Sequence, residues 1–179
     1  MARMNLANRI TILRILLIPF FIASVLYSKL EIAILIFIIA SITDGIDGYI
    51  ARTRGQRTEL GKILDPIADK LLILSALICL SVAKSIPPNL KLPPYVPIII
   101  ISRDAIIVLG VLLIYFIKGH LEVKPTTVSK VTTFFQMLTV VAILLRSGFS
   151  PLIWNIAVGF TIVSGVNYFI KGSRILNAK

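Results

Sequence analysis

Residues 43–69 read TDGIDGYIARTRGQRTELGKILDPIAD and contain Asp44, Asp47, Asp65 and Asp69, half of the eight acidic residues in the chain. The first two aspartates are spaced i,i+3 and the last two i,i+4, so on a helix each pair lies on one face. Each pair also borders a long apolar run. Because carboxylates are costly beside hydrocarbon, this cluster predicts a compensating cation or a polar cavity.

The composition is that of an integral membrane protein. Of the 179 residues, 57% are hydrophobic and only 15% are charged, against roughly 25% charged residues in soluble domains. The mean hydropathy is +0.95. A net charge of +11 would suggest nucleic acid as the partner of a soluble domain. Here the cations fall between apolar segments, so we expect membrane lipids and no nucleic acid as partners.

Six apolar segments approach the roughly 20 residues that a membrane-spanning helix needs. They are Ile10–Tyr27, Ile32–Ala51, Ile67–Ala83, Tyr95–Ile117, Val128–Leu145 and Leu152–Ile170. Proline and glycine residues separate the later ones. We therefore expect an all-α polytopic membrane protein with six transmembrane helices and a short N-terminal interfacial helix. Residues 1–179 would form a single membrane domain without a separate soluble unit.

The distribution of lysine and arginine predicts the orientation of these segments. Four cations fall on one side of the predicted membrane, namely Lys29, Lys84, Lys91 and Arg146. Fourteen fall on the other side, which also holds both termini and the aspartate-rich stretch, and Arg103 lies within the fourth segment. Because cytoplasmic loops carry the excess of Lys and Arg, we expect a protein of the cell inner membrane with its termini and active site in the cytoplasm.

The first segment carries a polar stripe. Asn5, Asn8, Thr11 and Arg14 recur every three residues between apolar ones, which places them along one side of a helix. One interpretation is an ordinary interfacial helix entering the membrane. The other is that the stripe lines the same cytoplasmic cavity as the aspartates.

The aspartates predict metal-assisted phosphate chemistry. They end the second apolar segment and begin the third, so two antiparallel helices would bring both pairs to the same depth. Four carboxylates that close would repel unless cations neutralised them, and hard oxygen ligands suit Mg²⁺, Mn²⁺ or Ca²⁺. Such a metal beside arginine and lysine can neutralise charge in a phosphate displacement. The alternative is a set of helix-end carboxylates paired with neighbouring cations.

The spacing Asp44-x₂-Asp47-Gly48-x₂-Ala51-Arg52-x₈-Gly61-x₃-Asp65-x₃-Asp69 resembles the signature of the CDP-alcohol phosphatidyltransferases, with eight of eight fixed positions present. The six-segment layout and the N-terminal Asn8-x-x-Thr11-x-x-Arg14 extend the resemblance over nearly the whole chain. The resemblance implies that an alcohol attacks the β-phosphorus of a CDP-linked lipid and that CMP leaves. It also implies a homodimer.

The resemblance further implies roles for the matching residues. Asp44, Asp47, Asp65 and Asp69 would share two ions of Mg²⁺ or Mn²⁺, and Asp69 would also be the catalytic base. The nucleotide-binding residues would be Gly48, Ala51 and Gly61 beside the cytidine, with Arg52, Asn8 and Thr11 at the nucleotide or its phosphates. The donor would be CDP-diacylglycerol.

The acceptor alcohol depends on the second half of the chain. Arg103 and Lys130 would bind it or support its pocket, unless Arg103 only pairs with Asp104 inside the membrane and Lys130 only reaches the interface. We predict glycerol 3-phosphate, which would make the protein a phosphatidylglycerophosphate synthase. However, members that use this acceptor usually have further cations at the positions of Val111 and Thr132. Phosphatidylglycerol, as in CMP-forming cardiolipin synthases, therefore stays open, as do inositol phosphate, serine and ether-lipid variants.

Two other classes of protein are alternatives to a phosphatidyltransferase. A cation or solute transporter would use the aspartates as an ion relay, but it would distribute its carboxylates through the depth of the membrane. A membrane scaffold that has lost catalysis is disfavoured because every signature aspartate is present.

Overall fold

A computed structural model describes the backbone of residues 6–53, 59–118 and 127–177, and the side chains of residues 11–43, 67–110, 127–171 and 173. Over these residues the chain forms six helices and no strand. The helices are α1 (Leu6–Leu26), α2 (Leu30–Thr53), α3 (Glu59–Val82), α4 (Tyr95–Lys118), α5 (Thr127–Leu144) and α6 (Ser150–Asn177). The all-α prediction is confirmed.

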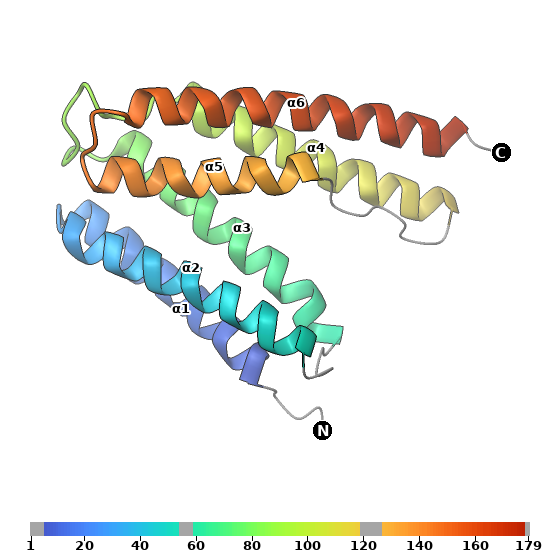
Figure 1. The fold of residues 1–179 in the computed structure, drawn as a ribbon, viewed down its shortest axis with the longest axis horizontal. Helices are drawn as coiled ribbons and strands as arrows, with labels where there is room; N and C mark the ends of the chain where they lie inside the picture. The colour runs from blue at the N-terminus through green and yellow to red at the C-terminus, as the bar shows by residue number, and fades with distance from the viewer. Residues whose placement is uncertain (1–5, 54–58, 119–126, 178–179) are drawn as a thin grey trace.

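The helices form two groups of three. α1 packs on α2 and α3, while α6 packs on α4 and α5, and α3 and α5 contact each other between the groups. The first residues of α1, α3 and α5 lie at one end of the molecule, as do the last residues of α2, α4 and α6 (Figure 1). This alternation brings the two stretches that carry the aspartates together, because α2 ends and α3 begins at that end.

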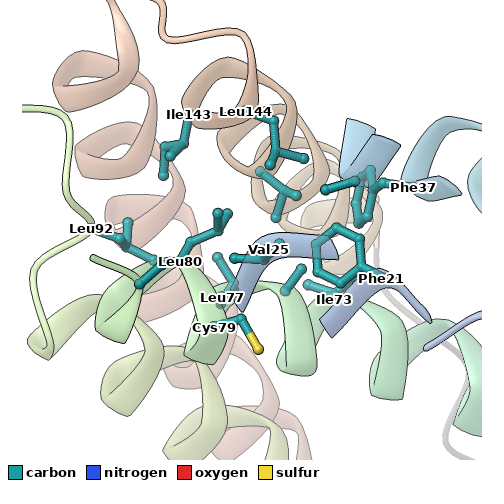
Figure 2. Packing of buried hydrophobic residues seen from close by; sticks show 14 of the residues in the cluster. Phe21, Val25, Phe37, Ile73, Leu77, Cys79, Leu80, Leu92, Ile143 and Leu144 are labelled. Carbon is teal, nitrogen blue, oxygen red and sulfur yellow. The ribbon is translucent and has the colours of Figure 1, made fainter. Parts of the chain in front are cut away.

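The main core fills the space where α1, α2, α3 and α5 meet (Figure 2). The rings of Phe21 in α1 and Phe37 in α2 lie 5.9 Å apart, a separation typical of favourable aromatic pairs. Leu77 of α3 and Ile143 of α5 belong to the same cluster and are completely buried. This core joins the two groups and extends along α3 to Ile73, one helical turn from Asp69.

The outer faces of the helices are also apolar. Large hydrophobic side chains are exposed on every helix, for example Phe20, Leu35, Leu109 and Phe169, each more than half exposed. Patches of this extent are rare on soluble monomers and indicate contact with lipid or protein. Within the described side chains, two helices are long and apolar enough to cross a membrane, over Thr127–Leu144 and Ser150–Lys171, and Thr11–Leu26 and Leu30–Thr43 are shorter apolar stretches.

Hydroxyl side chains within the helices satisfy their hydrogen bonds locally. Ser41 Oγ donates to the carbonyl of Phe37, Thr139 Oγ1 to Phe135 and Thr161 Oγ1 to Ala157, at 2.7–2.8 Å. Each bond reaches back four residues along the same helix. Polar side chains can therefore lie in an apolar environment without leaving an unpaired donor.

The observed helices correct two details of the prediction. The aspartates were predicted to end the second apolar segment and begin the third, but α2 runs through Arg52 to Thr53 and α3 starts at Glu59, before Lys62. The aspartates therefore lie inside the helices and not at their ends. The predicted interfacial helix is not separate from the first span in the described residues, since α1 is continuous from Leu6.

Candidate functional site

A cavity of about 270 Å³ opens between α3, α4 and α5. Its charged lining residues are Asp69 and Lys70 from α3, Asp104 from α4 and Lys130 from α5. Ser129, Thr133 and Gln136 of α5 add neutral polar groups, and Ile73 and Leu74 supply an apolar wall. Two of these residues, Asp69 and Lys130, were predicted from the sequence to bind the reactants.

Asp69 is the predicted site carboxylate whose side chain the structure describes. It is half-buried on α3 and faces the cavity. Asp65 lies one helical turn earlier on the same helix, and Asp44 and Asp47 lie in the second half of α2. The side chains of these three aspartates lie outside the described residues, as do those of Asn8, Gly48, Ala51, Arg52 and Gly61. Their roles therefore stay predictions.

Arg103 lies behind the cavity wall. Its side chain is 7% exposed, and its guanidinium donates to Asp104 Oδ1 at 2.6 Å. It also donates to Ser129 Oγ at 2.9 Å and to Ser164 Oγ of α6, and it lies over the ring of Tyr168, 5.7 Å from its centroid. The buried Arg103–Asp104 pair considered in the sequence analysis is confirmed, and Arg103 connects α4 to both α5 and α6.

Asp104 joins this cluster to the cavity. While one carboxylate oxygen accepts from Arg103, the other lies 3.2 Å from Nζ of Lys70. Lys70 is 39% exposed and Asp104 13%, so the pair lies at the boundary between the buried cluster and the open cavity. Lys70 was not among the site residues predicted from the sequence. Its position directly after Asp69 was the available signal.

The described part of the polar stripe, Thr11 and Arg14 of α1, faces inward. Thr11 and Arg14 are each only 1% exposed, which an interfacial helix facing solvent would not require. Arg14 Nε donates to the carbonyl of Ala40 in α2 at 3.2 Å. Ala40 precedes Asp44 by one helical turn, so the described part of the stripe packs against the helix that carries the first two aspartates.

Position 132 does not face the cavity. The hydroxyl of Thr132 donates to the carbonyls of Val128 and, across the helix interface, Phe160 of α6, at 2.8 Å and 3.1 Å. Thr133 is the residue that lines the cavity instead. A lysine at position 132 would extend from the side of α5 that faces α6. The cavity wall therefore loses no cation because residue 132 is threonine. Val111 lies in α4, and its side chain lies outside the described residues.

Residues 4–163 match the sequence model of the family described as CDP-alcohol phosphatidyltransferase. The chain belongs to the CDP-alcohol phosphatidyltransferase family. A CDP-diacylglycerol--glycerol-3-phosphate 3-phosphatidyltransferase of Bacillus subtilis is 38% identical over 96% of this chain and 97% of its own length. A protein of the same name from Rickettsia felis is 36% identical over 92% and 93%. A probable phosphatidylglycerophosphate synthase of Mycobacterium tuberculosis is 34% identical over 95% and 82%.

As a member of this family, the chain is a phosphatidyltransferase. The cavity is chemically suited to such an enzyme, because a carboxylate lies beside two ammonium groups. The carboxylate can accept a proton, and the ammonium groups can attract an anionic reactant.

Proposed function

We propose that this protein transfers the phosphatidyl group of CDP-diacylglycerol to glycerol 3-phosphate, forming phosphatidylglycerophosphate and releasing CMP. The observation that carries this proposal is Asp69, the last aspartate of the family signature, on the wall of a cavity that also presents Lys70 and Lys130. The relatives named for the same reaction at 36% and 38% identity support it.

The size of the cavity favours a small acceptor. Pockets for drug-sized ligands measure roughly 300–1,000 Å³, and this one is about 270 Å³. A three-carbon phosphate ester fits such a volume whole, whereas phosphatidylglycerol could place only its headgroup there. The two lysines suit the phosphate of the acceptor, since ammonium groups bind phosphate through charge-assisted hydrogen bonds.

In the proposed reaction Asp69 is the general base. It accepts the proton of the acceptor hydroxyl as the hydroxyl oxygen forms a bond to the β-phosphorus. The bond between that phosphorus and the oxygen of CMP breaks, and its electron pair leaves with CMP. Binding the acceptor in the cavity aligns its hydroxyl with the phosphorus, which removes much of the entropic cost of the encounter. Asp69 then releases its proton to solvent.

Two ions of Mg²⁺ or Mn²⁺ would be held by Asp44, Asp47, Asp65 and Asp69. The donor set fits these metals, because carboxylate oxygens are the ligands that they prefer. The fold supports the assignment by bringing the end of α2 and the start of α3 together (Figure 1). When bound, the ions would supply charge neutralisation for the diphosphate. Arg52, Asn8, Thr11, Gly48, Ala51 and Gly61 would contact the nucleotide.

The proposal places all six helices across the cell inner membrane, with the active site and both termini in the cytoplasm. The exposed apolar side chains on every helix support six crossings. The four cations assigned to the far side, Lys29, Lys84, Lys91 and Arg146, lie in the connections opposite to the site, as the rule for cytoplasmic lysine and arginine requires. A homodimer is also proposed, on the family resemblance alone.

An acceptor panel tests the proposed function. Purified protein is incubated with CDP-diacylglycerol, Mg²⁺ and one of four acceptors: glycerol 3-phosphate, phosphatidylglycerol, inositol 1-phosphate or serine. The lipid products are identified by mass spectrometry. We expect phosphatidylglycerophosphate with glycerol 3-phosphate and little product with the others. Cardiolipin as the main product would instead identify phosphatidylglycerol as the acceptor. Divalent-ion flux in vesicles without lipid turnover would favour the transporter.

A further inference from the structure

We propose that Lys70 is a specificity-determining residue that binds the phosphate of the acceptor, and that Asp104 is the positioning residue that directs it. The inference rests on the proposed function. Three observations lead to it: the fixed position of Asp104, the position of Lys70 beside the base, and the balance of charge around the cavity.

The carboxylate of Asp104 is held in place by Arg103, on the side away from the cavity. Its partner Arg103 is itself held by hydroxyls from two other helices, those of Ser129 and Ser164, and by the ring of Tyr168. A guanidinium with so many partners has little freedom to move toward a ligand, and it does not line the cavity. Arg103 therefore acts through Asp104, whose second oxygen faces Lys70 at 3.2 Å.

Lys70 can bind a ligand without leaving Asp104. An ammonium group has three N–H donors, and the contact with Asp104 uses one of them. The side chain is 39% exposed and borders the cavity, so the remaining donors are accessible to an anion. Asp104 reduces the freedom of the long side chain, which lowers the entropic cost of ordering it when the acceptor binds.

The position of Lys70 also matches the size of the acceptor. Lys70 directly follows Asp69, so their Cα atoms are about 3.8 Å apart, and both side chains face one cavity. A three-carbon acceptor carries its phosphate and its reacting hydroxyl at opposite ends of a short chain. A cation and a base on neighbouring residues can contact both ends at once.

The charges around the cavity favour the binding of a phosphate monoester. Arg103 and Asp104 neutralise each other, so Lys70 and Lys130 contribute two positive charges on the cavity side. A phosphate monoester carries about −1.5 to −2 at neutral pH. With the Arg103–Asp104 pair neutral, Lys70 and Lys130 outweigh Asp69 by one positive charge, whereas without Lys70 the charges of Lys130 and Asp69 would cancel and the attraction for such an anion would be lost.

Steady-state kinetics of the full-length protein test this inference. In Lys70→Met we expect the KM for glycerol 3-phosphate to rise about tenfold or more, because one charge-assisted phosphate contact is lost, while the KM for CDP-diacylglycerol stays unchanged. Inorganic phosphate should inhibit the variant less strongly than wild type, in competition with the acceptor. Lys70→Gln, which is polar but uncharged, should behave as Lys70→Met does. Asp104→Asn should raise the same KM less, and Asp104→Glu should restore it in part.

Lys171→Met is the control, since it removes an exposed cation on α6 and should leave all constants unchanged. A wild-type KM for glycerol 3-phosphate in both Lys70 variants would overturn the inference and leave the proposed function intact. A fall in kcat with an unchanged KM would also overturn the inference, because it would indicate that Lys70 acts on the catalytic base Asp69. Failure of wild-type protein to convert glycerol 3-phosphate would overturn the proposed function, and the inference with it, before any variant is compared.

Discussion

Arg103 determines how the cavity wall is built. It is a charged residue within an apolar helix, and the structure gives it a carboxylate, two hydroxyls and an aromatic ring as partners. Gly165 of α6 lies against it, and a Cβ at that position would be 3.5 Å from Arg103 Cγ, an ordinary contact. Buried charges are tolerated when they are paired and hydrogen-bonded in this way.

Replacing Arg103 should therefore destabilise the protein. In Arg103→Leu the carboxylate of Asp104 loses its closest cation while it remains 13% exposed. Breaking a buried pair on one side costs about 3–5 kcal/mol when the remaining charge is uncompensated. Asp104 would keep Lys70 as a partner, so we expect a smaller but measurable fall in the midpoint of thermal unfolding in detergent. Arg146→Leu, at an exposed position, serves as the control and should change the midpoint little. An unchanged midpoint in Arg103→Leu would contradict the structural role.

Individual site residues could be predicted from the sequence only in part. Asp69 and Lys130, which line the cavity, were among the predicted residues, because the signature spacing and the charge within an apolar region are visible in the sequence. Lys70 was missed since its contact with Asp104 comes from another helix. The orientation of Thr132 toward α6 also depends on helix packing, and a list of neighbours along the chain does not contain that information.

At the scale of the helices, α1 and α5 end in the same backbone motif. After α1, Lys29 N–H donates to Ser24 and Ser28 N–H to Val25, at 2.8 Å and 3.1 Å. After α5, Ser147 and Arg146 donate to Ala142 and Ile143, both at 2.9 Å. The pattern is a Schellman motif. Its left-handed position, usually glycine, is occupied by Ser28 with φ 64° and by Arg146 with φ 53°.

Ser28→Gly should stabilise the protein. Glycine adopts the left-handed conformation without the steric cost that a Cβ imposes, so we expect a gain of about 0.5–1 kcal/mol in the free energy of unfolding. The measurement is thermal or denaturant unfolding in detergent. Ser28→Ala keeps the Cβ and should show no such gain, and equal effects of both changes would argue against the conformational explanation.

The existence and order of the six helices could be predicted from apolar segments and breakers. The lengths of the helices were harder to predict from the sequence. α3 begins at Glu59, eight residues before the predicted apolar segment, because its first two turns carry the charged residues Glu59, Lys62 and Asp65. Hydropathy reports which residues can enter lipid, whereas a helix continues wherever its backbone hydrogen bonds can form.

At the scale of the whole molecule, the site lies where the two groups of helices meet. α3 belongs to the first group, α4 and α5 to the second, and the cavity opens between them. The apolar core that joins the groups includes Ile73, which also forms part of the cavity wall. Polar contacts such as Lys70–Asp104 add to it around the cavity, in a region where reactants must enter and leave.

The proposed orientation can be tested with single cysteines. Cys79 is the only cysteine of the chain and is buried, so Cys79→Ala provides a background. Lys84 and Lys171 are both exposed, the first in the connection after α3 and the second near the end of α6. In intact cells a membrane-impermeant maleimide should label Lys84→Cys and not Lys171→Cys, which should react only after permeabilisation. The reverse pattern would invert the topology.

The central claim, phosphatidyl transfer with Asp69 as base, is tested most directly by measuring CMP and phosphatidylglycerophosphate together. Purified wild-type protein with CDP-diacylglycerol, glycerol 3-phosphate and Mg²⁺ should form the two products in equal amounts. Asp69→Asn should still bind CDP-diacylglycerol but turn over at least about a hundredfold more slowly, as loss of a general base predicts. Wild-type turnover in Asp69→Asn, or CMP released without phosphatidylglycerophosphate, would contradict the account.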